Sequence, residues 1–315
     1  MATQWLRRAW LAAAGASALL LAACGGGSVE SSFTPTRIVA FGDAMADIGQ
    51  NNGRRYTIND GSSNNWTEVV ARGYGVPIAP ASAGGTSYAT GNARVVLEPD
   101  AGGLTANRTV AEQVDAFLAA GGPRAGDLLI VNAGTSDLVV QARAAAEGRQ
   151  SRDEMITAVK QAARDLAAQV ERLVAAGGSR VMLVGPINLG RTPWAHELDQ
   201  VTLFESATRA FNTELLVRLA NYGETVLYVD AEREFNIYWF ELGEYEAPVC
   251  TSTDSADADE GIGTGAGQVD SSECTTGTVR VGDPQNYLFA DRLYPTPRGH
   301  QLFGDYALGR IRERW

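Results

Sequence analysis

The sequence has few of the side chains that most often carry enzyme chemistry: its 315 residues include three cysteines and two histidines. It also lacks any run of lysine or arginine, and its formal charge is −11. Proteins that bind DNA or RNA use basic clusters to contact the phosphate backbone, so we exclude nucleic acid as a partner. The simplest role of the acidic surface is to keep the protein soluble.

Only the N-terminus contains a long apolar run. Arg7 and Arg8 precede this run, which ends in Leu21-Ala22-Ala23-Cys24. The run is too short for a permanent transmembrane helix, and the pattern is typical of a secretory signal. The last four residues resemble a bacterial lipobox, in which the cysteine is lipidated and becomes the mature N-terminus. The alternative is an ordinary secretory signal with a chance cysteine.

We therefore predict a lipoprotein signal peptide at residues 1–23. Lipidated Cys24 and a flexible Gly- and Ser-containing tether follow at residues 24–36, and one folded domain spans residues 37–315. Gly25 follows the cysteine where Asp would signal retention at the inner membrane. The expected location is the bacterial cell envelope, with a lipid anchor in the outer membrane and the protein on its periplasmic or surface face.

The other two cysteines, Cys250 and Cys274, form a pair in an oxidising compartment, and we predict a disulfide between them. It closes a loop at 251–273 that is rich in Gly, Ser, Thr and Asp and that would be disordered without the bridge. Calcium binding by its acidic residues is an alternative to a solvated loop, which we favour because the spacing is not that of an EF-hand. Those residues are Asp254, Asp257, Asp259 and Glu260. We predict no metal site and no cofactor.

Short apolar runs alternate with helical patterns along the rest of the chain, which predicts an α/β fold with a mostly parallel sheet covered on both faces. Capping-box spacing at Ser151–Glu154 starts the clearest helix, which ends before Gly177-Gly178. Further helices are predicted at about 201–221 and from Thr296-Pro297 to the C-terminus. The predicted strands are Ile38–Phe41, Leu128–Val131, Val181–Val184 and Val226–Val229.

Three polar turns directly follow predicted strands: Asp43-Ala44, Gly134–Asp137 and Gly185–Asn188. Ligands of parallel α/β sheets bind outside the carboxyl ends of the strands. We therefore expect the three turns to converge on one crevice.

Six segments resemble the conserved blocks of the SGNH/GDSL hydrolases and follow one another in the family's order. Phe41-Gly42-Asp43-Ala44-Met45-Ala46-Asp47 is similar to F-G-D-S-L-S-D, and Asn132–Asp137 is similar to the G-x-N-D block. The remaining matches are Ser63–Glu68, Thr86–Ala93, Gly185–Pro193 and Asn286–Thr296, the last similar to N-Y-L-F-x-D-x-x-H-P-T. The closest resemblance is to bacterial esterases and lipases carried as autotransporter passengers. It implies a three-layer α/β/α fold and acyl-transfer chemistry without a cofactor.

The resemblance also assigns the family's site to positions of this chain. The nucleophilic serine falls on Ala44, the catalytic histidine on Tyr294, and the aspartate on Asp291. The oxyanion-hole glycine falls on Gly91 and the oxyanion-hole asparagine on Ser136. A methyl group cannot attack an ester, and a phenol with a pKa near 10 is a poor base at neutral pH.

We therefore expect an inactive pseudo-esterase that binds a small acyl or sugar ligand or a protein partner. An active ester hydrolase with an unconventional site, using Ser87 or Ser136 as nucleophile, is one alternative. A structural envelope lipoprotein is the other. His300 is expected to be a packed structural residue, and His196 a surface residue in a loop. Asp43 and Asp47 are expected to form turns and caps.

Overall fold

The central sheet has four parallel strands in the order β1-β2-β3-β4. The structure, a computed structural model, describes residues 33–62, 64–242, 247–254 and 261–315. The strands are the four predicted from the sequence: β1 (Arg37–Gly42), β2 (Asp127–Asn132), β3 (Val181–Val184) and β4 (Val226–Val229). Nearly every residue in them is buried, as expected for strands covered on both faces.

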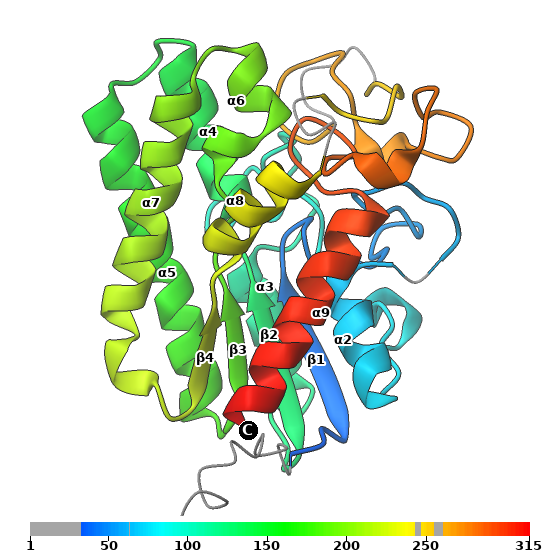
Figure 1. Ribbon diagram of the computed structural model, residues 1–315. Coiled ribbons are helices and arrows are strands. Elements are labelled where there is room, and N and C mark those ends of the chain that lie inside the picture. The colour runs from blue at the N-terminus through cyan, green and yellow to red at the C-terminus, as the bar shows by residue number, and fades with distance from the viewer. Residues whose placement is uncertain (1–32, 63, 243–246, 255–260) are drawn as a thin grey trace, which may run out of the picture.

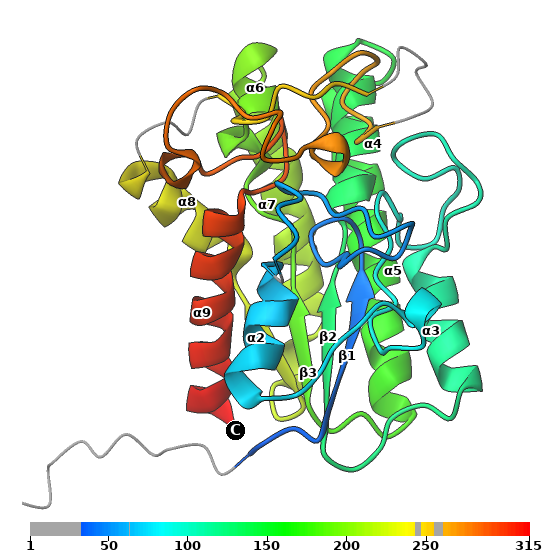
Figure 2. The same ribbon diagram turned by 90° about the vertical axis from the view of Figure 1, so that its right-hand side faces the viewer.

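Helices cover the two faces of this sheet and make the three-layer architecture (Figures 1 and 2). One layer contains α2 (Trp66–Tyr74) and α9 (Pro297–Arg314), which pack against each other. The opposite layer contains α3 (Val110–Ala119), α5 (Arg152–Ala175) and α7 (Val201–Arg218), with α5 and α7 in extensive contact. The predicted α/β/α fold is therefore confirmed.

The long predicted helix is α5, and its capping box is present, because Ser151 and Glu154 bind each other's backbone N–H groups. The helix predicted at about 201–221 is shorter, since α7 ends at Arg218 and a 3₁₀ turn, Ala220–Tyr222, follows. Five helices were not predicted from the pattern: α2 and α3, described above, and three that lie near the carboxyl ends of the strands. These three are α4 (Thr135–Ala146), α6 (Pro193–Glu197) and α8 (Ala231–Glu241). His196 lies in α6, so its expected position in a loop was wrong.

The described residues 247–254 and 261–295 form a lobe of turns above the carboxyl ends of the strands. This disulfide lobe contains the predicted bridge, Cys250–Cys274. Both cysteines are buried in a small apolar cluster with Ile58, Val249 and Ala290. Asp257, Asp259 and Glu260 lie outside the described residues, as do the signal segment and most of the tether. Among the residues that the structure describes, no helix is long and apolar enough to cross a membrane, and no group of three or more metal-binding side chains gathers.

Candidate active site

The turn after β1 places Asp43 and Ala44 at the carboxyl end of the sheet. Gly42 permits this turn, because it has a φ of +149° and a Cβ there would lie 1.9 Å from the Asn132 carbonyl oxygen. Gln113 fixes the turn from α3: its side-chain oxygen accepts the Gly42 N–H at 2.8 Å, and its amide donates to the Gly42 carbonyl at 2.9 Å. The position matched to the nucleophile therefore has the strand-end setting that the family uses.

The carboxylate of Asp43 caps α4 and brings the third block to the same point. It accepts the N–H of Thr135 at 2.9 Å, and the N–H of Ser136 also faces it. Burial raises the pKa of Asp43 to about 7, against the effect of these N–H groups. The turns after β1 and β2 are thus joined, as expected, and Asp43 is a cap rather than a group that faces a substrate.

Tyr294 is the residue that the resemblance matches to the catalytic base, and it is 1% exposed. Burial raises the pKa of its phenol well above the ordinary value, and the nearby carboxylates of Asp43 and Asp291 raise it further. The Ser136 hydroxyl is close enough to lower that pKa, although the two oxygens do not form a hydrogen bond of normal geometry. A phenol in this setting stays protonated at neutral pH and cannot accept a proton from a nucleophile.

Asp291 does not orient a catalytic base, because its oxygens are bound to the backbone. One oxygen accepts the N–H groups of Leu293 and Tyr294 at 2.7 and 2.6 Å, and the other accepts the N–H of Ser271 at 3.1 Å. Burial raises the pKa of this carboxyl to about 7. Asp291 therefore holds the turn that aims Tyr294 inward and ties it to the disulfide lobe.

The N–H of Gly91, the group expected to bind an oxyanion, donates instead to the Asp47 carboxylate at 2.7 Å. Asp47 also accepts the N–H groups of Gly49 and Gln50, each at 2.8 Å, and this confirms its expected turn-forming role. Burial raises the pKa of Asp47 to about 6.

Tyr56 packs against the Cα of Gly91, whose N–H is bound by Asp47. A Cβ at Gly91 would lie 2.0 Å from the Tyr56 hydroxyl oxygen, so the phenol rests directly on this glycine. The rings of Tyr56 and Tyr294 pack edge to face with their centroids 5.4 Å apart. Tyr56 rests on Gly91 and Tyr294 lies near the Asp43 carboxylate, so the two packed rings occupy space beside the positions matched to the family's site.

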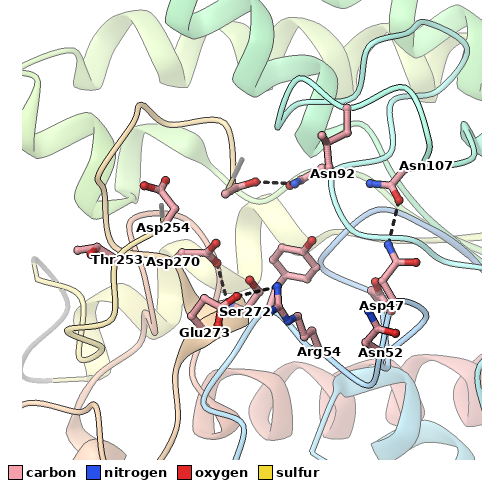
Figure 3. A pocket seen from close by; sticks show the side chains of 14 residues that line it. Asp47, Asn52, Arg54, Asn92, Asn107, Thr253, Asp254, Asp270, Ser272 and Glu273 are labelled. Atoms are coloured by element: carbon pink, nitrogen blue, oxygen red, sulfur yellow. Dashed lines mark hydrogen bonds and ion pairs between the residues drawn. The ribbon is translucent and has the colours of Figure 1, made fainter. Parts of the chain in front are cut away.

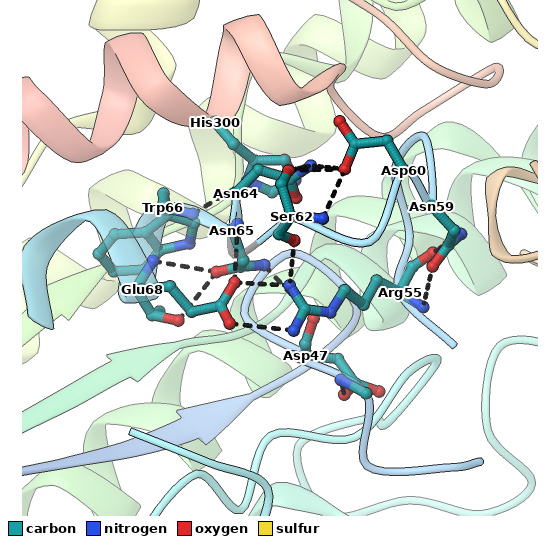
Figure 4. Close-up of polar contacts among 12 residues, drawn as sticks. Asp47, Arg55, Asn59, Asp60, Ser62, Asn64, Asn65, Trp66, Glu68 and His300 are labelled. Atoms are coloured by element: carbon teal, nitrogen blue, oxygen red, sulfur yellow. Dashed lines mark hydrogen bonds and ion pairs between the residues drawn. The ribbon is translucent and has the colours of Figure 1, made fainter. Parts of the chain in front are cut away.

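A polar network fixes the segment that carries Tyr56 (Figure 4). Arg55 forms a two-point ion pair with Glu68, at 2.7 and 3.0 Å, and Glu68 also accepts the N–H of Asn65, which caps α2. Asn59 donates to the carbonyl groups of Arg55 and Ser271, at 3.0 and 3.1 Å. The network therefore ties Tyr56 both to α2 and to the lobe that holds Asp291.

All five positions matched to the family's site are consequently buried: Ala44, Gly91, Ser136, Asp291 and Tyr294. The turns after β1 and β2 meet as expected, but the residues matched to the site are buried rather than open to a crevice.

An open cavity of about 510 Å³ is lined in part by Tyr56. Figure 3 shows several of its other lining side chains. Its walls come from the loops at 47–56 and 92–107 and from the disulfide lobe. Amide and carboxylate side chains dominate the lining: Asp47, Asn51, Asn52, Asn92, Asn107, Asp254, Asp270 and Glu273.

The remaining candidate residues have structural contacts. His300 accepts the N–H of Trp66 at 3.4 Å, and burial lowers its pKa to about 3, so it is a neutral packed residue as predicted. His196 stacks on Trp239 with ring centroids 6.1 Å apart. Ser87 bridges to Ala40 and Pro80 and is buried, away from any strand-end turn.

A sequence model of the GDSL-like lipase/acylhydrolase family matches residues 38–307. The chain belongs to this family. A search of curated proteins gave no match.

Similar solved structures include a lipolytic protein of the G-D-S-L family from Veillonella parvula, at 12% identity and TM-score 0.47, over 87% of this chain and 96% of that one. An aryl esterase of M. smegmatis matches at 15% identity and TM-score 0.46, over 89% and 100%. An extracellular lipase of Streptomyces rimosus matches at 14% identity and TM-score 0.46, over 87% and 98%.

Tyr56 is the site residue that the sequence did not reveal. It lies between the first two motif blocks, in a segment without any family pattern. No local pattern points to it, because its contact with Gly91 joins segments that are far apart in the sequence.

Proposed function

We propose that this member of the family does not hydrolyse esters and acts by binding a ligand. The observation that carries the proposal is the burial of Ala44 together with the packing of Tyr56 on Gly91 and on the Tyr294 ring. Acyl transfer needs a nucleophile, a base within hydrogen-bonding reach of it and free donors for the oxyanion. Here the nucleophile is a methyl group, the base is a protonated phenol, and the Gly91 N–H is bound to Asp47.

A set of restored variants tests this part of the proposal by hydrolysis of a short p-nitrophenyl ester. Ala44→Ser alone stays inert, because no base activates the serine. Ala44→Ser with Tyr294→His also stays near background, since Tyr56 still covers Gly91. Addition of Tyr56→Ala and Asp47→Ala together uncovers Gly91, frees its N–H and gives turnover, whereas the matched addition of Tyr56→Phe and Asp47→Ala keeps the ring and does not. Turnover by the unmodified protein would contradict the proposal.

For the ligand we propose a neutral, hydroxyl-rich molecule of the saccharide type in the cavity that Tyr56 helps to line. Carboxylates on its wall disfavour anionic acyl or phosphate ligands, while side-chain amides and an aromatic ring suit sugar hydroxyl groups and sugar faces. The side-chain oxygen of Asn92 is buried without a hydrogen-bond partner among the described residues, although its amide nitrogen donates to the Gly261 carbonyl at 2.6 Å. An acceptor in that state supports binding of a hydroxyl donor.

Titration calorimetry with a panel of neutral and acidic oligosaccharides tests the ligand class. Asn92 has a φ of +61°, so Asn92→Gly removes the side chain without strain. This variant should weaken binding of a neutral oligosaccharide by about tenfold or more, while the exposed control Asn286→Gly should not. Binding restricted to acidic oligosaccharides, or unchanged in Asn92→Gly, would contradict the assignment.

We further propose that the protein is anchored in the cell envelope through a lipid on Cys24. The lipobox-like sequence supports this proposal. Metabolic labelling with an alkynyl fatty acid should mark the protein, and Cys24→Ser should abolish the label. A wild-type protein without label would contradict the anchor.

A further inference from the structure

The end of the molecule opposite the candidate site gathers arginines from segments far apart in the sequence. Arg124 and Arg180 lie in the loops that enter β2 and β3, and Arg218 is the last residue of α7. Arg312 and Arg314 lie in the last turn of α9. The amino ends of the strands and the C-terminal ends of α7 and α9 lie at the same end of the fold (Figures 1 and 2). These five residues are called the basic end below.

Within the described part of the chain, none of these five arginines forms an ion pair. The carboxylates nearby are mostly bound to other arginines: Asp127 to Arg37, Asp115 to Arg172, and Glu313 to Arg310. Glu171, Glu224 and the terminal carboxylate are the other acidic groups near this end. Since the whole chain carries −11, the basic end stands out against a strongly acidic remainder.

Helix geometry alone explains only part of this gathering. Arginine is favoured at helix C-termini because it offsets the negative end of the helix dipole, and Arg218, Arg312 and Arg314 have that setting. Arg124 and Arg180 lie in loops and gain nothing from a helix dipole. A ligand or surface that carries negative charge accounts for all five.

The first described residue of the chain lies at this same end. Phe33 packs edge to face against Trp315, with ring centroids 6.2 Å apart, and its N–H donates to the Trp315 carbonyl at 3.2 Å. The Arg180 guanidinium lies 4.1 Å from the centre of the Phe33 ring, and that of Arg312 lies 5.5 Å from the Tyr74 ring. Phe33 is buried, but Tyr74 and Trp315 are partly exposed, and Tyr and Trp beside arginines are side chains favoured at a bilayer–water boundary.

We propose that the basic end faces a membrane surface rich in anionic phospholipid and holds the candidate site away from it. The electrostatic part of this inference does not depend on the proposed ligand or on the loss of hydrolysis. The proposed lipid anchor agrees with this inference. The nine residue-to-residue steps from Cys24 to Phe33 span at most about 30 Å when fully extended. A tether of that length keeps the basic end near the bilayer while still allowing the molecule to rotate, so the arginines would set its orientation.

Spin labels on the full mature protein in vesicles test the orientation. One label is introduced with Val217→Cys, next to the basic end, and the other with Val281→Cys, in the lobe at the opposite end; both side chains are exposed. The vesicles contain phosphatidylcholine, phosphatidylglycerol and a lipid whose headgroup chelates nickel. Nickel should raise the spin-relaxation rate of the label at position 217 at least about threefold more than that of the label at position 281. High salt or pure phosphatidylcholine should reduce the difference to the part that the tether alone imposes.

A charge-matched pair of variants supplies the control. Arg124→Gln, Arg180→Gln and Arg312→Gln together should reduce the preference for position 217 in anionic vesicles toward the value seen in pure phosphatidylcholine. The control variant combines Arg149→Gln, Arg209→Gln and Arg233→Gln. It removes the same charge from arginines that already bind glutamates, and the preference for position 217 should be unchanged. Equal relaxation at the two positions in anionic vesicles, or equal loss in the two triple variants, would overturn the proposal. If the first triple variant does not fold, the salt and lipid series is measured on the spin-labelled protein that keeps all its arginines, and that series decides the question.

Discussion

At the scale of single residues, Asp47 and Tyr56 decide what the Gly42-Asp43-Ala44 turn can do. Asp47 binds the Gly91 N–H, and Tyr56 covers the same glycine. The substitution of one catalytic residue would leave an open site with a missing group. Here the Gly91 N–H is already bound to Asp47 and the Tyr56 ring packs on the same glycine. The two contacts support each other and keep the site closed.

Gly91→Ala should destabilise the protein by about 1–3 kcal/mol, because a Cβ at this position meets the Tyr56 ring at 2.0–2.2 Å. In a Tyr56→Ala background the same change should cost far less, since the ring that it meets is gone. Urea unfolding of the four proteins measures this coupling. Additive costs would show that Tyr56 does not rest on Gly91.

The buried carboxyls predict a dependence of stability on pH. The folded-state pKa values of Asp43 and Asp291 are about 7 and that of Asp47 is about 6, all above the ordinary value of 3.8. Between about pH 4 and pH 7 the folded state therefore binds more protons than the unfolded state, and its stability falls as pH rises. The melting temperature should be higher at pH 5 than at pH 8, and Asp43→Asn should reduce the difference. A melting temperature that rises over this interval would refute the assignment.

At the scale of elements, the parts that the sequence predicts are those with a strong local pattern. The four strands are continuous apolar runs, and α5 has both a capping box and apolar residues three or four positions apart. The helices α4 and α8 were missed because their polar first turns lie against the carboxyl ends of the strands, where contacts with other segments stabilise them. Asp43, from another element, caps α4, and no pattern within α4 itself reveals that cap.

The candidate site likewise has a part that the sequence predicts and a part that it does not. Ala44, Asp291 and Tyr294 were found from motifs, because each block is contiguous in sequence. The closure by Tyr56 and the capture of the Gly91 N–H join segments more than thirty residues apart, and no local pattern encodes such contacts.

The disulfide supplies a prediction at this scale. Replacement of Cys250 and Cys274 by serine should cost about 3 kcal/mol, on the loop-entropy argument for a bridge that spans 24 residues. Because Ser271 of the same lobe donates to Asp291, the loss should also loosen Tyr294. Amide hydrogen exchange of the pair variant should increase at residues 271–294 before the β strands exchange. Uniform exchange across the chain would contradict this local coupling.

At the scale of the whole molecule, a hydrolase fold is retained while its two ends differ in charge and chemistry. The carboxyl end of the sheet holds the closed site and an acidic, amide-rich cavity. The amino end holds the first described residue, the C-terminus and the basic end. This polarity suits a protein that presents a binding surface away from a membrane, which is how we interpret the retained family fold.

The central claim is that the protein does not perform acyl transfer, and intact-mass analysis after treatment with a fluorophosphonate tests it most directly. The reagent forms a covalent bond only with an activated nucleophile. We predict no mass increase in the wild-type protein under conditions that fully label an active GDSL esterase run in parallel. A stoichiometric mass increase that disappears when a single serine, such as Ser87 or Ser136, is changed to alanine would contradict the account.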